Sequence, residues 1–137
     1  LTLEPRTQGI RSKNVCVLTS ALYSYTSIKN IIIKDSNLNY TSIDGVVYTK
    51  DLKELVYVAA GRTNEVIIPD GVETIRSYST FSSQVGRKVS KMYIPNSVIN
   101  IADIEIELLN NGFIRKIEVA EDNPAFTLDG NGKLVRK

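Results

Sequence analysis

Side chains suited to catalysis are scarce in this chain of 137 residues. The chain contains no histidine, which is the commonest general base and the commonest transition-metal ligand. Cys16 is its only cysteine, so an internal disulfide and a cysteine-based metal cluster are excluded, and we expect Cys16 to be a small buried hydrophobe. The motifs of phosphate-binding loops, dinucleotide-binding folds, zinc proteases and serine hydrolases do not occur. We therefore expect a protein without enzyme activity and without a cofactor.

Three further patterns invite a functional interpretation, and each has a simpler one. Residues 129–132 read Asp-Gly-Asn-Gly but lack the spaced carboxylates of a calcium loop, so they indicate a tight turn. Glu105 and Glu107 are two residues apart, and such residues do not face each other on a helix, so we expect both at the surface. Residues 39–41 match an N-glycosylation acceptor, which matters only in a eukaryotic secretory source.

Composition and charge describe a folded domain of ordinary character. Hydrophobic residues make up 42% of the chain, enough to bury a core. The 17 lysines and arginines are nearly balanced by 15 acidic residues, and both are scattered, so we expect a solvated surface and no nucleic-acid partner. No apolar run approaches the roughly 20 residues that span a bilayer, so we expect no membrane insertion. No signal segment precedes Leu1, and we expect any such segment to lie outside this sequence.

A pattern of ten residues that occurs twice organises the chain. Residues 66–75 and residues 92–101 both read apolar, exposed, apolar, proline, a turn pair, valine, two polar-permitting positions and isoleucine, and the two copies are 26 residues apart. Each copy predicts a short strand whose first and third residues point inward, ended by proline and a turn. A fixed period of this length is typical of stacked units.

The repeat predicts a single domain over residues 1–137. A β-hairpin over residues 43–61, bracketed by Gly45 and Gly61, interrupts the period. The remaining units contribute strands near residues 1–3, 29–33, 65–68, 91–94 and 115–119.

Helical and internal-repeat signals complete the predicted architecture. Residues 14–25 fit a short helix, and residues 102–109 fit another with Ile104 and Leu108 on its buried face, ended by residues 110–112. In addition, residues 28–41 align with residues 114–127 at an offset of 86. This alignment places Asn37 on Asn123 and Tyr40 on Phe126, and predicts a second hairpin-like segment after Asp129.

The combination of strand, isoleucine, proline, turn pair, valine and isoleucine with residues 40–51 and 119–126 resembles the BspA-like leucine-rich-repeat proteins. The resemblance covers nearly the whole chain. It implies an α+β repeat, an irregular leucine-rich-repeat solenoid with one curved, mainly parallel sheet, short helices or turns on the other side, and an inserted β-hairpin. It also implies a secreted or surface-attached protein that adheres to host matrix proteins or to other cells.

Strand alternation predicts which side chains line the exposed face of this sheet. An apolar stripe with a polar edge of mixed charge is typical of a protein-binding surface. Alternatively, the hairpin, a neighbouring domain or a second copy of the chain covers the stripe, and the sequence leaves both interpretations open. The middle strand residues are Thr2, Ile32, Ile67, Tyr93 and Glu118, and the preceding column is Asn30, Glu65, Lys91 and Lys116. The predicted ligand-binding residues among them are Ile32, Ile67, Tyr93, Lys91, Lys116, Glu118 and Glu65.

The sequence thus predicts a non-catalytic extracellular module for protein binding or adhesion. It would act by burying Ile67 and Tyr93, flanked by Lys91 and Lys116, against a partner protein. The resemblance implies a host matrix or cell-surface protein as that partner, and self-association is a further option. The alternatives are a structural spacer domain of a larger surface protein and an accessory carbohydrate-binding domain of a secreted enzyme.

Overall fold

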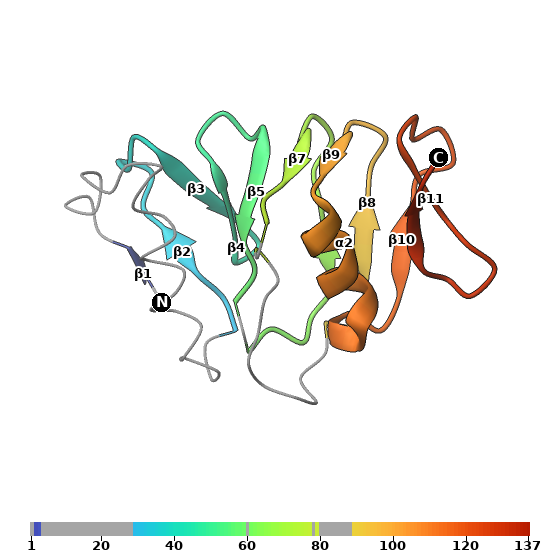
Figure 1. Ribbon diagram of the computed structural model, residues 1–137. Helices are drawn as coiled ribbons and strands as arrows, with labels where there is room; N and C mark the ends of the chain where they lie inside the picture. The colour runs from blue at the N-terminus through green and yellow to red at the C-terminus, as the bar shows by residue number, and fades with distance from the viewer. Residues whose placement is uncertain (1, 4–28, 60, 78, 80–88) are drawn as a thin grey trace.

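Short strands follow one another along the chain in the computed structural model of the protein (Figure 1). The structure describes residues 2–3, 29–59, 61–77, 79 and 89–137. The predicted helix over residues 14–25 and the burial of Cys16 lie outside the described residues. Within the described residues the strands form four sheets, of which two are purely parallel.

The repeat builds a parallel sheet of three strands in the order β10-β8-β6. Ile67 pairs with Tyr93, and Tyr93 pairs with Glu118, so neighbouring strands are offset by the 26 and 25 residues that the pattern predicts. A second parallel pair joins β1 to β2. The bounds are Val66–Ile67 for β6, Met92–Ile94 for β8, Ile117–Val119 for β10, Thr2–Leu3 for β1 and Ile32–Ile33 for β2.

A second, mixed sheet corrects the prediction of one curved, mainly parallel sheet. Each repeat contributes a further strand that ends at Ile75 or Ile101, seven residues after the buried Ile68 or Ile94, because proline and the turn pair redirect the chain there. The five strands run in the order β3-β4-β5-β7-β9, antiparallel up to β5 and parallel beyond it. Their bounds are Tyr40–Ile43 for β3, Val46–Thr49 for β4, Glu54–Tyr57 for β5, Thr74–Ile75 for β7 and Asn100–Ile101 for β9.

The predicted hairpin is present as the antiparallel pair of β4 and β5, but β3 extends it into a three-stranded meander. Asp44 and Gly45 join β3 to β4 with φ of 50° and 79°, the left-handed values of the two-residue turn that suits a hairpin. A Cβ at Gly45 would collide with the side chain of Asn30, so glycine is needed here for space as well as for φ. The hairpin therefore belongs to the second sheet rather than lying outside the array.

A second hairpin follows Asp129, as the internal alignment predicts. β11 (Phe126–Leu128) pairs antiparallel with β12 (Leu134–Arg136). The Asp129 side chain accepts hydrogen bonds from the backbone N–H groups of Asn131 and Lys133, which closes the turn. Residues 129–132 are thus a turn, in agreement with the simpler interpretation of their sequence.

The helix after β9 is shorter than predicted and buries a different face. α2 spans Asp103–Leu108 and continues as one π-helical turn, η2 (Leu109–Phe113), so Asn110 does not end the helical segment. Ile104 is 38% exposed, whereas Glu105 is fully buried. The prediction that Glu105 lies at the surface is wrong, because its carboxylate accepts a hydrogen bond of 2.9 Å from the Ser79 hydroxyl in the interior.

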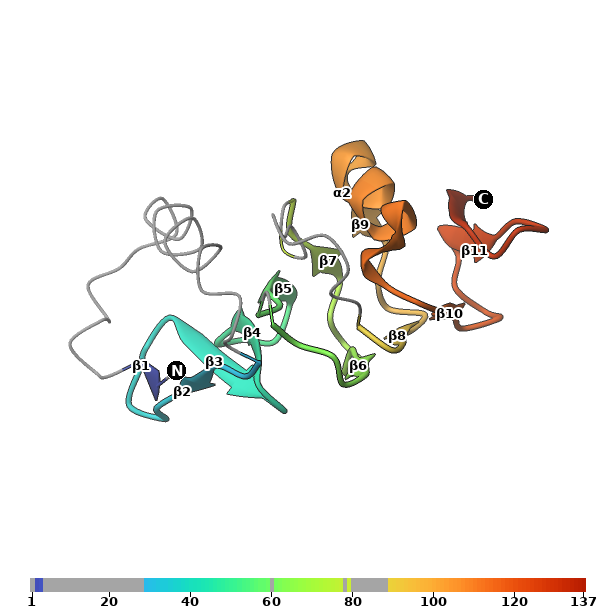
Figure 2. The same cartoon turned by 90° about the horizontal axis from the view of Figure 1, so that it is seen from below.

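The repeated isoleucines and valines meet in a common core between the sheets and the helix. Seen from below, β6, β8 and β10 lie along one side of the molecule and α2 lies on the other (Figure 2). Burying each such side chain contributes about 1.5–3 kcal/mol to the free energy of folding. The repeat positions in this core include Val66, Ile68, Val72, Ile75, Met92, Ile94, Val98 and Ile101.

Candidate functional site

The sheet of β6, β8 and β10 brings three of the predicted site residues into one row. Ile67, Tyr93 and Glu118 are register partners across the three strands. The flanking Met92 and Ile94 are fully buried, so the middle residue of the strand points to the opposite side, away from the core. We call this row, with the charged column before it, the sheet face. Its members are Glu65, Ile67, Lys91, Tyr93, Lys116 and Glu118.

Apolar surface remains accessible in the middle of the sheet face. The side chain of Ile67 is 54% exposed, and its partner Tyr93 is half-buried. An exposed isoleucine beside a tyrosine on a flat, rigid sheet can bury apolar area against a partner without first rearranging the backbone.

The charged residues of the sheet face form one connected series of ion pairs. The Nζ atom of Lys91 lies 3.5 Å from a carboxylate oxygen of Glu65 and 3.7 Å from one of Glu118. The Nζ atom of Lys116 lies 3.3 Å from the other oxygen of Glu118. Four of the predicted site residues, from three strands, are therefore in mutual contact.

These ion pairs orient side chains more than they stabilise the fold. The side chain of Lys91 is 32% exposed and the other three are more exposed still. Exposed pairs of this kind contribute about 0–1 kcal/mol each because water screens them. Their effect is a charged border of alternating sign beside Ile67 and Tyr93, which can select among partners.

Ile32 lies apart from the other predicted site residues. Its strand β2 pairs with β1 in a separate sheet, where Ile32 is the register partner of Thr2 as predicted. Ile32 is 56% exposed, but the β3–β5 meander intervenes in the chain before β6, and β2 does not pair with β6. The predicted stripe is thus divided into two separate parts.

Arg62 supports the sheet face and was not predicted from the sequence. Its side chain is only 1% exposed, and Nη2 donates a hydrogen bond of 2.7 Å to the backbone carbonyl of Glu65, just before β6. The guanidinium also donates to the Asp44 carbonyl and carboxylate, at 2.6 and 3.0 Å, and to Asn30 Oδ1 at 2.9 Å. Only the adjoining Gly61 distinguished this arginine in the sequence, so no pattern pointed to it.

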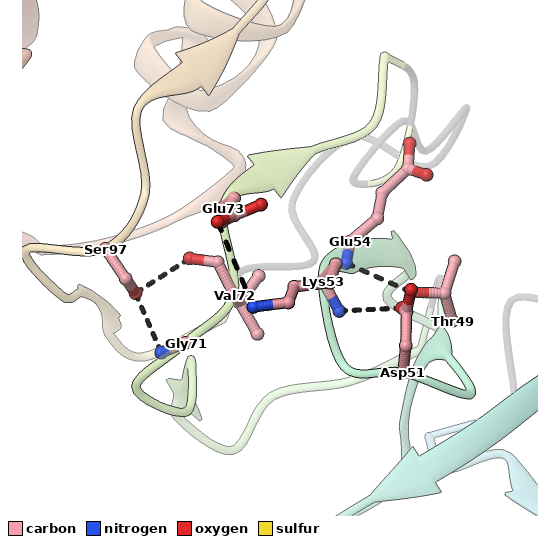
Figure 3. A network of polar contacts seen from close by, with 8 residues as sticks. All are labelled: Thr49, Asp51, Lys53, Glu54, Gly71, Val72, Glu73 and Ser97. Carbon is pink, nitrogen blue, oxygen red and sulfur yellow. Dashed lines mark hydrogen bonds and ion pairs between the residues drawn. The ribbon is translucent and has the colours of Figure 1, made fainter.

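Polar turns fix the opposite end of the repeat units (Figure 3). The Ser97 hydroxyl accepts a hydrogen bond from the Gly71 N–H at 3.0 Å and donates one to the Val72 carbonyl at 2.8 Å. Serine in the second turn pair thereby connects to the first turn pair, 26 residues earlier. These contacts keep β6 and β8 in register.

A neighbouring turn between β4 and β5 joins the same network (Figure 3). The Asp51 carboxylate accepts hydrogen bonds from the Thr49 hydroxyl at 2.7 Å and from the Lys53 N–H at 3.0 Å. The Thr49 hydroxyl, and after it the Lys53 N–H, lower the pKa of the Asp51 carboxyl because both bonds favour the ionised form. Lys53 in turn lies 3.9 Å from Glu73. These polar groups order the turns, and no reactive constellation results.

Groups that could hold a metal ion do not gather in the described part of the chain. Within residues 29–59, 61–77, 79 and 89–137, three or more histidine, cysteine, aspartate or glutamate side chains nowhere come close enough to share one. Among the same residues, no helix has the length and apolar character to cross a membrane.

Comparison with known proteins identifies similar folds. No family model matches the chain, and no curated protein matches it significantly. The crystal structure of the pneumococcal vaccine antigen PcpA is similar over 71% of this chain, with 19% identity and a TM-score of 0.51. A leucine-rich repeat protein from Eubacterium ventriosum matches over 72% of the chain, with 20% identity and a TM-score of 0.44.

The likeness to PcpA concerns the fold alone. This chain spans 23% of that structure and 32% of the one from Eubacterium ventriosum. The repeated strands in register, together with the likeness to PcpA, support a repeat fold of the kind that the sequence predicts. The chain thus has a sheet-dominated repeat fold similar to part of PcpA.

Proposed function

We propose that the chain is a non-catalytic, extracellular protein-binding module of the leucine-rich-repeat type, and that it binds through the sheet face. The observation that carries the proposal is the half-exposed Ile67 beside Tyr93, bordered by the ion-pair series of Glu65, Lys91, Glu118 and Lys116. An apolar centre within a polar border is the usual organisation of a protein interface.

The rigidity of the strands supports this proposal. β6, β8 and β10 are locked by backbone bonds such as Val66 N–H to Lys91 carbonyl at 2.7 Å, and by the core beneath them. Side chains on such a frame lose little conformational entropy on binding, so even a small apolar patch can contribute. The sheet face therefore needs no cofactor and no moving loop to act.

The comparisons support an extracellular setting. One similar structure is named a vaccine antigen and the other a leucine-rich repeat protein. A vaccine antigen must be reachable by antibodies, and this proposal extends the same accessibility to the present chain. BspA-like membership and adhesion to a host matrix or cell-surface protein belong to the same proposal.

Surface binding to immobilised proteins tests the proposal. The chain is passed over a panel of matrix proteins and glycans, beside a variant with Ile67→Lys and Tyr93→Lys. Because both side chains project from the sheet, the variant should fold, which circular dichroism verifies. We expect saturable binding to at least one protein, weakened about tenfold or more in the variant, as for loss of a central contact pair.

A matched control separates this face from general stickiness. Ile99 is also an exposed isoleucine, but it lies outside the sheet face, so Ile99→Lys should leave binding unchanged. If the wild-type chain binds nothing, or if the Ile67 and Tyr93 variant binds as well as the Ile99 variant, the sheet face is not the site. A structural spacer would then account better for the chain, and binding confined to glycans would favour an accessory carbohydrate-binding domain.

A further inference from the structure

The outer edge of β10 carries unused hydrogen-bonding groups. β10 is the last strand of its sheet, with β8 on its inner side only. Met92 N–H donates to the Lys116 carbonyl and Ala120 N–H donates to the Ile94 carbonyl, each at 2.9 Å, so alternate residues from Lys116 to Ala120 bond to β8. By the alternation of a parallel ladder, the backbone groups of Ile117 and Val119 face outward. Such an edge can accept another strand.

A small cavity opens at this same edge. Its volume is about 90 Å³, and it lies between η2, the residues leading into β10 and the turn that joins β11 to β12. Ile114 and Ile117 supply apolar wall, and Arg115 and Lys133 supply two cationic side chains. The edge of β10 and this cavity together are called the edge site.

The charge of the edge site has no counterpart within the described residues. No aspartate or glutamate lines the cavity. The Lys133 ammonium donates a hydrogen bond of 2.7 Å to the Asn110 carbonyl, a neutral group, and neither Arg115 nor Lys133 forms an ion pair with any described residue. Two cations that share a cavity without a carboxylate are complementary to an anionic group.

We propose that the edge site binds an extended, acidic segment of a partner protein. The segment adds its backbone to β10 as an extra strand, and a carboxylate of the segment enters the cavity between Arg115 and Lys133. A free anion would use the two cations but not the outward backbone groups of Ile117 and Val119. The strand edge therefore favours a peptide, and the cations favour an acidic one. This inference is independent of the sheet face, which lies on the broad side of the same sheet.

A labelled peptide tests the edge site. The probe is a fluorescein-labelled peptide of eight residues in which valine and aspartate alternate, and its counterpart has lysine in place of aspartate. Fluorescence anisotropy should show saturable binding of the acidic probe only, weaker as the salt concentration rises. Hydrogen exchange should show slower exchange of the Ile117 and Val119 amides when the acidic probe is bound.

Variants on the surface decide between specific and general attraction. The double variant Arg115→Glu, Lys133→Glu should weaken binding of the acidic probe about tenfold or more. Lys50→Glu, on the distant turn between β4 and β5, should change it less than twofold, and the Ile67→Lys, Tyr93→Lys variant should bind normally. Absence of binding, equal loss in the Lys50 variant, or unchanged exchange at Ile117 and Val119 would overturn the proposal. Loss in the Ile67 and Tyr93 variant would overturn it as well, since binding would then belong to the sheet face.

Discussion

Asn37 and Asn123, 86 residues apart in the chain, make the same pair of hydrogen bonds. The side-chain oxygen of Asn37 accepts from the N–H groups of Asn39 and Tyr40, at 2.9 and 3.0 Å. The side-chain oxygen of Asn123 accepts from the N–H groups of Ala125 and Phe126, both at 2.8 Å. Each asparagine therefore sets the start of the second strand of its unit, β3 or β11.

Asn123 also ties its unit to the preceding one, which makes its replacement costly. The side chain is fully buried, and its Nδ2 donates to the carbonyls of Pro95 and Val98 at 2.8 and 2.9 Å. Asn123→Ala leaves four buried backbone groups without these partners, so we expect a loss of about 3 kcal/mol or more in the free energy of unfolding. Urea unfolding followed by circular dichroism measures it.

A second asparagine in the same array is the matched control. Asn96 is exposed, and its Nδ2 donates only to the Asp122 carboxylate at 2.8 Å. Asn96→Ala should therefore cost no more than about 0.5 kcal/mol. Equal losses for the two variants would contradict the role assigned to Asn123.

Arg62 should prove one of the most sensitive charged residues of the chain. Arg62→Lys cannot reproduce the forked set of bonds from two nitrogens to Asn30, Asp44 and Glu65. We expect a loss of about 2–4 kcal/mol in the free energy of unfolding, because a buried cation would then be incompletely bonded.

Arg76 provides the comparison for Arg62. It forms a two-pronged ion pair with Glu54, with both bonds at 2.9 Å, but the arginine side chain is 22% exposed. Arg76→Lys should therefore cost about 1 kcal/mol or less, since water can replace part of the lost contact. A larger loss for Arg76→Lys than for Arg62→Lys would show that burial does not decide the cost.

The sequence predicted the repeat better than it predicted the sheets. A register of 26 and 25 residues follows from isoleucine, proline and valine at fixed positions, and these residues act locally through strand alternation and turns. The strands at Ile75 and Ile101 were not predicted, because a strand of two residues leaves no period to recognise. The buried face of α2 was assigned wrongly, since only the tertiary partner Ser79 makes burial of Glu105 favourable.

The candidate site shows the same limit. Charge and alternation correctly placed Ile67, Tyr93 and Glu118 in one row, because those strands are neighbours in the repeat. Ile32 could not be placed, because the route of the β3–β5 meander between β2 and β6 depends on long-range pairing. Arg62 could not be found at all, because its partners are separated from it by as many as 32 residues.

Two glycines with similar backbone angles should differ in their tolerance of a side chain. Gly45 and Gly71 have φ of 79° and 99°, so alanine is strained at both and costs about 1–2 kcal/mol for that reason. A Cβ at Gly45 would in addition meet the side chain of Asn30, whereas the space around Gly71 is open. Urea unfolding should therefore show a clearly larger loss for Gly45→Ala than for Gly71→Ala. Equal losses would mean that Asn30 moves aside freely.

Asp51 should make the stability of the chain depend on pH in the acidic range. Since the Thr49 hydroxyl and the Lys53 N–H lower its pKa in the folded protein, the carboxylate contributes stability that is fully present above the unfolded pKa. This contribution is lost as the pH falls through the lowered pKa of the folded state. Asp51→Asn should thus be less stable than the wild-type chain at about pH 7, and the difference should shrink toward about pH 2.

The control for this prediction is Asp35→Asn. Asp35 is an exposed residue whose carboxylate accepts no hydrogen bond from the described residues, so its amide variant should follow the wild-type curve at every pH. Urea midpoints measured from about pH 2 to about pH 7 give the comparison. A constant difference between the Asp51→Asn variant and the wild-type chain across this range would show that the amide disturbs the turn itself. The ionised carboxylate would then not be the source of the stability.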